Sequence, residues 1–397
     1  MTTDAEVIVA GAGPAGAAAA RALAAAGVDV ILCDRSRFPR DKACGDGLIP
    51  DALAALGTMG LADAVRARAH QAPSLRVLSP SGIEVEFRTP LQVVPRVVLD
   101  HLLVQSARDA GARFRHVTIE RPIVDGSYVA GIVGTDMDTR AAVELRAPLT
   151  VLATGGAGRV LAAFDSTARV RASGTAVRTY AVPAGAALDG SLWIALEPDL
   201  LPGYAWAFPA PGHRVNVGVG TLSDSGHPSS RINLRRRLDQ LVAGGGVLGR
   251  RVGRFADATP YLGAPLRTGL TGATLGQPGL AIIGEAAGTT YSISGEGIGK
   301  ALESGLLVGE MATRAPRDLA QAGLRYAAVM QERHAARFRS YARAQKLVAR
   351  AWVADYVARR ANESPWLHRR LTGIITEREL PSRVFSARAL WHLLVTR

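Results

Sequence analysis

A glycine motif near the N-terminus has the residue types and spacing to bind a nucleotide. In AEVIVAGAGPAGAAAARALAAAG, an apolar run leads into Gly11, Gly13 and Gly16, and an alanine-rich segment follows. Gly11 permits a tight turn, Gly13 lets the backbone approach a pyrophosphate, and Gly16 allows close packing of helix and strand. Pro14 suits the first helical turn, where free N–H groups attract phosphate. Asp34 ends the next apolar run and can accept a hydrogen bond from a ribose hydroxyl. The motif predicts dinucleotide binding.

A second group with possible chemistry is the thiol of Cys44, in the loop sequence RFPRDKACGDGL. A free cysteine often serves as buried apolar filler, and the alternative is a functional thiol. A reactive thiolate would need a lowered pKa, for which Arg40 and Lys42 are the cations nearest in sequence. Lys42 is equally well explained as a solvated loop cation. Both interpretations of the cysteine remain open from the residues alone.

Three aromatic residues alternate in PGYAWAFP, where Tyr204, Trp206 and Phe208 occupy every second position. On a strand this spacing places all three rings on one face. Burial of each ring contributes ~4–6 kcal/mol, so the rings are not expected to face water. They face either packed core or an apolar ligand cavity. The alternating valines of 213–222 predict the partner strand, joined by a proline–glycine turn.

The elements that must position these groups include two further glycine turns, each after a buried apolar run. APLTVLATGGAGRV spans 147–160, and GLAIIGEAAGTTYSISGEGIGKALESG spans 279–305. A glycine-rich turn that opens a helix presents free N–H groups and a positive dipole end. Aimed at a flavin ring, that end would stabilise the anionic N1–C2=O region of the reduced form. The alternative is that both stretches are ordinary turns of an α/β fold.

Taken together, these stretches make the chain similar to the flavoprotein superfamily of aromatic hydroxylases, flavin-dependent halogenases and geranylgeranyl reductases. Within it, the chain most resembles the geranylgeranyl reductase group, over about residues 5–310. Three stretches carry this resemblance: the arginine–lysine–cysteine–glycine loop, the Y-x-W-x-F-P motif, and GEGI followed by a helix containing ESG. Thr154-Gly155 and Gly284-Glu285 depart from the usual Asp-Gly and Gly-Asp pairs. These departures bear on the identity of the substrate more than on the binding of a flavin.

The resemblance implies an α/β fold of the p-hydroxybenzoate hydroxylase type, with three parts. A discontinuous Rossmann-like FAD domain is expected over 1–75, 95–170 and 260–312. An antiparallel β-sheet domain that covers the substrate is expected over 76–94 and 171–259. The region 313–397 is expected to be helical, with a break near Pro365.

The motifs and the resemblance together predict the residues that bind FAD. Arg96 heads an amphipathic helix, and its guanidinium could reach the pyrophosphate or the flavin edge. The full set expected to bind FAD is Gly11, Gly13, Pro14, Ala15, Gly16, Asp34, Arg35, Lys42, Cys44, Gly45, Arg96, Gly155, Gly284, Glu285, Gly295, Gly297 and Ile298.

The function that the resemblance implies is reduction of a C=C bond in an apolar, prenyl-like or natural-product substrate. Reduced flavin N5 would deliver hydride, and Cys44 or a water would protonate the other carbon. Tyr204, Trp206 and Phe208 would form the substrate wall. NAD(P)H or a small redox protein would supply electrons. The alternatives are a flavin monooxygenase or halogenase, since GYAWAFP is similar to the halogenase G-W-x-W-x-I-P pattern, and a flavoprotein whose FAD is structural.

The composition of the chain further limits the classes of protein to which it can belong. The 397 residues are 48% hydrophobic and 20% charged, which is typical of a globular protein, and no apolar run is long enough for a transmembrane helix. Two cysteines and the lack of a signal peptide predict a reducing, cytoplasmic setting. The net charge is +13, and 314–397 holds 17 Lys and Arg against 6 Asp and Glu. This region is either a solvated helical cap or a basic surface for a diphosphate or an anionic membrane. No nucleic-acid partner and no metal site are expected.

Overall fold

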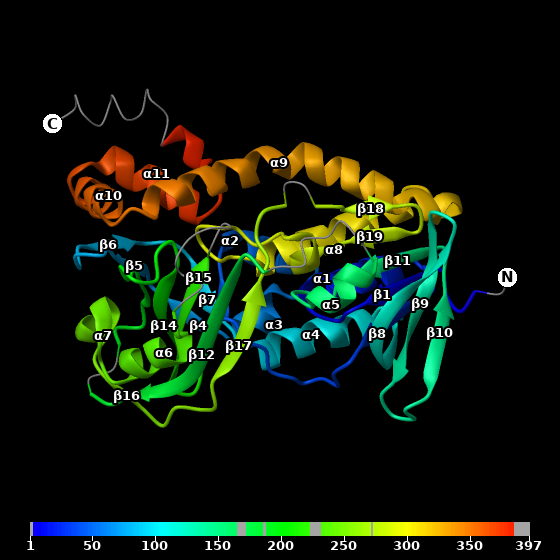
Figure 1. Cartoon of the computed structure of the whole chain (residues 1–397), viewed down its shortest axis with the longest axis horizontal. Coiled ribbons are helices and arrows are strands. Elements are labelled where there is room, and N and C mark those ends of the chain that lie inside the picture. Colours follow the sequence, from blue (N-terminus) through cyan, green and yellow to red (C-terminus); the bar gives the residue numbers. More distant parts are fainter. Residues whose placement is uncertain (1–2, 165–171, 186–187, 223–231, 271–272, 385–397) are drawn as a thin grey trace.

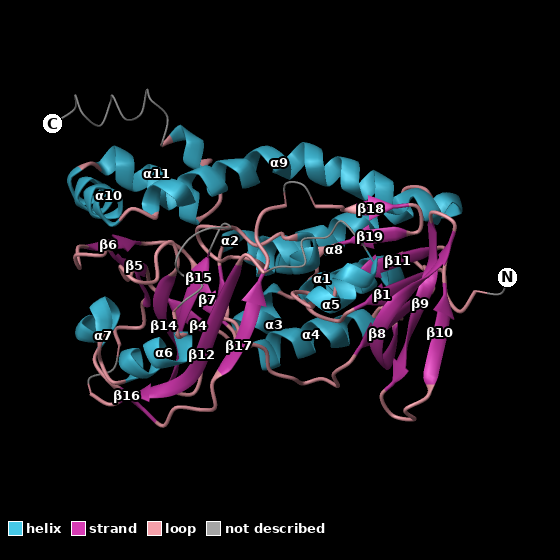
Figure 2. Cartoon of the chain, viewed as in Figure 1, coloured by secondary structure: helices cyan, strands magenta, loops and turns pink. Residues whose placement is uncertain are grey.

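The computed structural model describes residues 3–164, 172–185, 188–222, 232–270 and 273–384. Its two larger sheets occupy opposite ends of the view in Figures 1 and 2, with a long helix running above both. Within these ranges, no helix combines the length and the apolar character needed to cross a membrane.

The first sheet is built around a parallel centre of five strands, β8, β2, β1, β11 and β19. β1 and β2 are buried along their whole length, as expected for parallel strands covered on both faces. In spatial order the strands are β10 (Ala142–Arg146), β9 (Tyr128–Asp136), β8 (Arg113–Asp125), β2 (Val30–Asp34), β1 (Val7–Ala10), β11 (Leu149–Leu152), β19 (Leu280–Ile282) and β18 (Gly276–Gln277).

Helices α1 (Pro14–Ala25), α4 (Arg96–Asp109), α5 (Gly158–Phe164) and α8 (Ile298–Thr313) accompany this sheet. α1 is rich in alanine, and α8 packs on it at glycine positions. A Cβ at Gly305 would lie 2.2 Å from the carbonyl oxygen of Ala15, and one at Gly309 would lie 2.7 Å from Cβ of Ala22. The small residues therefore let two helices that open at glycine turns approach closely.

The second sheet is mainly antiparallel, and its two faces pack against different partners. Helices α6 (Leu234–Val242) and α7 (Gly246–Val252) share a core with Ala205 and Ala207 on one face. The opposite face carries Trp206 and Phe208, which belong to the other core. In spatial order the strands are β16 (Phe255–Ala256), β12 (Gly174–Pro183), β15 (Arg214–Leu222), β14 (Tyr204–Ala210), β13 (Leu192–Ala195), β5 (Leu75–Leu78) and β6 (Glu84–Phe87), with β17 (Leu262–Leu266) also paired to β12.

A small third sheet lies within residues 47–93, and two of its strands contact β14 of the second sheet. It consists of β3 (Gly47–Leu48), β7 (Leu91–Val93) and β4 (His70–Ala72), and it is accompanied by α2 (Pro50–Thr58) and α3 (Ala62–Arg66). Its strand β3 directly follows the Cys44 loop, so pairing of β3 with β7 fixes one end of that loop.

The described part of the C-terminal region, 313–384, is helical as predicted, and 385–397 lies outside the described residues. α9 (Ala322–Val348) packs against β18 and β19 at one end, and α10 (Ala351–Glu363) packs against β6 at the other. The break near Pro365 is confirmed: α10 ends before it, Ser364 caps the next helix, and α11 (Pro365–Ile375) begins. Short 3₁₀ segments complete the described elements, η2 (Gly284–Ala287), η3 (Pro316–Gln321) and η4 (Pro381–Arg383).

The sheets differ from the expected domain boundaries at two places. Strand β17 lies inside the range 260–312 expected for the FAD domain, yet it pairs with β12 of the second sheet. Strands β4 and β7 were expected in different domains, yet they pair with each other. In both cases a short strand adds to a neighbouring edge, which the local sequence does not reveal.

Candidate cofactor and substrate site

A cavity of about 590 Å³ lies between the two large sheets and the C-terminal helices. The glycine turns form one end of it, the Cys44 loop and the aromatic strand form its middle, and apolar side chains form the other end. The residues predicted to bind FAD line this cavity except Gly16 and Gly284. Added Cβ atoms at those two glycines would meet Gly11 and Ala15, so they serve packing between elements.

The first glycine turn has the shape that a pyrophosphate requires. Gly11 has φ +110°, and a Cβ there would lie 2.4 Å from the carbonyl oxygen of Ala153. At Gly13 the nearest atom to an added Cβ is a guanidinium nitrogen 3.9 Å away, so the space beside the helix start is open. The Asp34 carboxylate accepts hydrogen bonds from the backbone N–H groups of Ala12 and Ser36, both at 2.8 Å. Each oxygen retains acceptor capacity for a ribose hydroxyl.

Three other predicted residues from distant segments meet at the same end of the cavity. Lys42 Nζ lies 3.1 Å from Glu285 Oε2. A Cβ at Gly155 would lie 3.4 Å from that oxygen and 3.6 Å from the lysine nitrogen. Gly297 is the N-cap of α8, whose first residue, Ile298, also lines the cavity. An open glycine cradle, an acid for ribose and a helix N-terminus together fit FAD.

The Cys44 thiol lies in a different electrostatic setting from the one expected. Burial is the largest influence and raises its pKa, while Arg96 opposes this and Asp46 reinforces it. Arg40 does not act on the thiol because it pairs with Asp100 at 2.7 Å, and Lys42 pairs with Glu285. The expectation of a pKa lowered by Arg40 and Lys42 is therefore wrong. The cysteine is held as a neutral thiol.

Arg96, which was predicted to bind FAD, is fixed in place by an ion pair with Asp100. It is buried, and its Nε and Nη2 donate to the two oxygens of Asp100, both at 2.7 Å. It lines the cavity beside Cys44. A bidentate pair of this kind fixes the orientation of the guanidinium.

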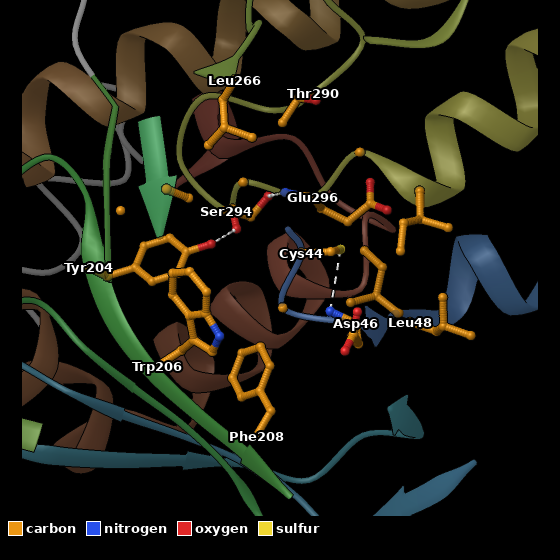
Figure 3. A pocket seen from close by; sticks show the side chains of 18 of the residues that line it. Cys44, Asp46, Leu48, Tyr204, Trp206, Phe208, Leu266, Thr290, Ser294 and Glu296 are labelled. Atoms are coloured by element: carbon orange, nitrogen blue, oxygen red, sulfur yellow. Dashed lines mark hydrogen bonds between the residues drawn. The ribbon is translucent and has the colours of Figure 1, made fainter. Parts of the chain in front are cut away.

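The aromatic strand is part of the cavity wall. Tyr204, Trp206 and Phe208 all line the cavity, while the alanines between them pack on the opposite face, which confirms the predicted alternation. Figure 3 shows the three rings in a row along β14, opposite the loop that carries Cys44 and Asp46. Ring centroids are 6.0 Å apart for Tyr204–Trp206 and 6.5 Å apart for Trp206–Phe208. The predicted partner strand is confirmed as β15.

A polar network behind the rings was not predicted. Trp206 Nε1 donates to Asn216 Oδ1 at 2.9 Å, and Asn216 Nδ2 donates to Asp46 Oδ2 at 2.7 Å and to the carbonyl of Cys44 at 2.8 Å. The Tyr180 hydroxyl also donates to Asp46. Burial raises the pKa of Asp46 to about 6. The available sequence signal was Asn216, which alternates with the valines of β15 and so lies on the opposite face, because a buried polar side chain needs a partner.

A cluster of buried acids adjoins the GEGI turn. Asp51, Glu296 and Glu377 bring carboxylate oxygens within 4.8 Å of one another. Lys300 Nζ lies 3.2 Å from Asp51 and 3.1 Å from Glu377 and supplies the compensating cation. Burial raises the pKa of Glu296, and burial followed by repulsion from Asp51 raises that of Glu377 to about 8. The cluster ties the segment after α11 to the start of α8.

The far end of the cavity is apolar, and the C-terminal helices help to close it. Side chains from β5, β6 and β13 form one side, and α10 and α11 form the other. From the sequence, the C-terminal helices were predicted to be either a solvated cap or a basic surface. Their place in the cavity wall was not predicted, because an amphipathic pattern does not reveal what covers its apolar face. Representative lining residues are Val77, Phe87, Ile194, Val357, Leu371 and Ile374.

Comparison with known proteins agrees with this geometry. A family model described as an FAD-binding domain matches residues 4–187. A menaquinone reductase of Mycolicibacterium smegmatis is 34% identical, with 79% of this chain and 77% of the relative covered. Digeranylgeranylglycerophospholipid reductase 1 of Methanopyrus kandleri is 30% identical, with 78% and 80% covered.

Solved structures support the fold. A geranylgeranyl bacteriochlorophyll reductase-like protein of Thermoplasma acidophilum matches with a TM-score of 0.75 at 21% identity, covering 99% of this chain and 96% of that one. A flavin-dependent brominase matches with a TM-score of 0.74 at 18% identity, covering 98% of each. The p-hydroxybenzoate hydroxylase-like fold class is thereby confirmed.

Proposed function

Because the chain belongs to the geranylgeranyl reductase-like family of FAD-dependent oxidoreductases, we propose that it reduces a C=C bond in a polyisoprenoid chain. The observation that carries this proposal is one continuous cavity, which joins FAD-type glycine turns to an aromatic wall and an apolar end. Two relatives are named as reductases of menaquinone and of digeranylgeranylglycerophospholipid. Both molecules carry long isoprenoid chains, which suit an apolar cavity with few polar groups.

FAD, held by the glycine turns at Gly11 and Gly13 and by the start of α8, would supply the hydride when it is bound and reduced. The residues of this chain then have separate tasks. The rings of Tyr204, Trp206 and Phe208 hold the flat, apolar double bond and exclude water. Cys44 carries the second hydrogen as a proton, since burial raises its pKa and keeps the thiol protonated at neutral pH. Arg96, fixed on Asp100, steadies the thiolate that remains after donation.

Anaerobic flavin spectroscopy separates this function from the alternatives. The purified FAD-loaded protein is reduced without oxygen, menaquinone is added, and the return of the oxidised flavin absorbance is followed. Reoxidation by menaquinone supports the proposed reductase where the extracted lipid has gained two hydrogen atoms in its isoprenoid chain, because the quinone ring alone can also accept the electrons. A hydroperoxide-type absorbance that forms only in air would indicate a monooxygenase or halogenase. Turnover while the flavin stays oxidised would indicate a structural FAD.

The role of Cys44 is tested in the same assay. Cys44→Ala removes the proton source, and the rate of substrate-driven reoxidation should fall on the order of a hundredfold, as for loss of a general acid. Cys33→Ala is the matched control, because that thiol is buried in β2 away from the cavity. An unchanged rate in Cys44→Ala would assign protonation to a water molecule.

The electron donor is proposed to be NAD(P)H or a small redox protein. Anaerobic addition of NADPH or NADH to the oxidised holoprotein tests the first possibility directly. Bleaching of the flavin absorbance within a turnover time identifies a nicotinamide donor. A flavin that bleaches only with a reduced ferredoxin-type protein identifies the second.

We also propose that α10 rests on an anionic membrane surface from which the substrate enters. One side of α10 lines the cavity, through Val357 and its neighbours, while Trp352 is 68% exposed on another side. Arg350 and Arg359 are exposed near it. An exposed tryptophan among arginines is suited to a lipid headgroup layer, where each cation contributes about 1 kcal/mol.

Vesicle co-sedimentation tests this contact. The holoprotein should bind vesicles of phosphatidylglycerol and phosphatidylcholine, and Trp352→Ala should weaken binding several-fold. Val124→Ala is the control, since Val124 is also exposed but lies on β8 of the first sheet. Equal vesicle binding by both variants and the wild type would show that Trp352 does not contribute to membrane binding.

A further inference from the structure

Asp46 is a buried carboxyl group that the proposed mechanism does not yet use. It lines the cavity one residue beyond Gly45, between the Cys44 loop and β3. We propose that Asp46 returns a proton to Cys44 after each turnover and is itself resupplied from solvent through the hydroxyl of Tyr180. The inference rests on the proposed role of Cys44 and makes Asp46 a positioning residue that holds and moves the proton.

The loop geometry places the two residues close together on the cavity wall. Asp46 has φ 63°, a left-handed conformation that is uncommon for residues other than glycine. Its backbone N–H donates to Cys44 Sγ at 3.3 Å, and both side chains line the same cavity. Gly45 is confined by the wall, because a Cβ there would lie 3.2 Å from the ring of Phe208. Figure 3 shows Cys44 and Asp46 on this loop, next to the three rings.

The two oxygens of Asp46 have different surroundings. Oδ2 accepts hydrogen bonds from Asn216 and from the Tyr180 hydroxyl. Oδ1 is buried and has no hydrogen-bond partner among the described residues. An unpartnered buried carboxylate oxygen is costly, whereas a protonated one can donate into the cavity. The geometry therefore favours an acid that carries its proton on Oδ1.

A route to solvent leaves the other side of the carboxyl group. Tyr180 is half-buried, and the guanidinium of Arg178 stacks on its ring at 4.4 Å. Arg178 binds Asp41, whose side chain is 39% exposed. The charged groups that face Asp46 are Arg178 from β12 and Arg96 from α4, and β15 contributes the neutral Asn216. Tyr180 thus connects the buried acid to Arg178 and, through Arg178, to the partly exposed Asp41.

The proton balance closes with water as the source. The substrate carbon gains a proton as the S–H bond of Cys44 breaks and leaves a thiolate. The O–H bond of Asp46 then breaks as the S–H bond reforms. Oδ2 of the carboxylate takes a proton from the Tyr180 hydroxyl, which takes one from water, and rotation of the carboxyl group returns the protonated oxygen to the Oδ1 position. Because burial raises the pKa of Cys44 above its usual 9.0, whereas Asp46 titrates at about 6, transfer from the acid to the thiolate is downhill.

Asp46→Asn tests the relay, because asparagine keeps the size of the side chain and an oxygen that accepts from Tyr180 and Asn216. Menaquinone and dithionite are added without oxygen, and turnover is measured by mass spectrometry as the gain of two hydrogen atoms in the isoprenoid chain, because dithionite also reduces the quinone ring directly. Wild-type steady-state turnover should fall as pH rises through the pKa of Asp46. The variant should lose this limb and turn over about tenfold to a hundredfold more slowly at pH 6. Its first turnover should change little, since Cys44 already holds a proton.

A second measurement does not depend on the substrate. Alkylation of Cys44 by iodoacetamide in the FAD-loaded protein is followed by mass spectrometry between pH 5 and 9. Ionisation of Asp46 raises the pKa of the thiol, so the wild-type profile should bend near pH 6 and the Asp46→Asn profile should not. If Asp46→Asn does not fold, Tyr180→Phe replaces it and should give the same steady-state loss.

Asp239→Asn is the matched control, because Asp239 also accepts from a tyrosine, Tyr261, at 2.8 Å but lies on the outer helix α6. It should behave as wild type in both assays. Identical pH profiles for Asp46→Asn and wild type in both assays would overturn the relay. If the wild type does not reduce menaquinone, the proposed function fails, whereas a bend lost in Asp46→Asn would still show that ionisation of Asp46 acts on the Cys44 thiol.

Discussion

Gly218 controls where the central ring of the cavity wall can lie. It faces Trp206 across the β14–β15 pair, and a Cβ at this position would lie 2.1 Å from Cζ2 and 2.5 Å from Cε2 of the indole. Carbon atoms in contact are about 3.5–4 Å apart, so Gly218→Ala must push the indole away by an ångström or more. That movement breaks the 2.9 Å hydrogen bond to Asn216, which also holds Asp46.

The expected loss of stability follows from these contacts. Overpacking a buried site costs about 1–3 kcal/mol, and the lost hydrogen bond adds about 1 kcal/mol. Urea unfolding of Gly218→Ala should therefore show a free energy of unfolding about 2–4 kcal/mol below wild type. Turnover with menaquinone should fall, while FAD content stays unchanged because the glycine turns are not touched.

Gly220→Ala provides the matched control two residues along the same strand. A Cβ there would lie 3.4 Å from Cβ of Ala176 and 3.7 Å from the Trp206 ring, which are ordinary contacts. This variant should retain stability and turnover. Equal behaviour of the two alanine variants would refute the assignment of Trp206 as a wall that Gly218 makes room for.

Two further predictions concern the cofactor cradle and the acid cluster. Gly11→Ala should lower the FAD content measured by the ratio of flavin to protein absorbance, since its φ of +110° and the Ala153 carbonyl exclude a Cβ; Gly57→Ala, in open space on α2, should retain FAD. Glu377 has its pKa raised to about 8 by burial, so it stays protonated at a pH where the unfolded chain is ionised, and stability should fall as pH rises from about 5 to 8. Denaturant unfolding of Glu377→Gln over this range should give a flatter profile, and a slope equal to that of wild type would contradict the assignment.

Local sequence patterns predicted the parts of the fold that rest on short-range rules. The turn at Gly11 and the alternation of Tyr204 with Trp206 are settled within a few residues by backbone conformation and by the pleat of a strand. The structure agrees, since Gly11 has a positive φ and Tyr204 and Trp206 lie on strand β14. The fold class and the family were predicted from the resemblance that these motifs carry, not from the short-range rules alone.

The polar part of the site was not accessible in this way. Asp46 meets Asn216 across 170 positions and Tyr180 across 134. No local rule connects such segments, because their approach depends on how the second sheet docks on the first. For the same reason, Arg40 is near Cys44 in sequence but binds Asp100 in space. Nearness in sequence is a poor guide to the charge that controls a buried thiol.

Product analysis of one anaerobic turnover tests the central claim most directly. The FAD-loaded protein is reduced, mixed with menaquinone without oxygen, and the lipid is extracted for mass spectrometry. The account predicts a product that has gained two hydrogen atoms in its isoprenoid chain, formed at the rate at which the oxidised flavin returns. A product that gains oxygen only in air, or flavin that reoxidises while the isoprenoid chain stays unchanged, would contradict it.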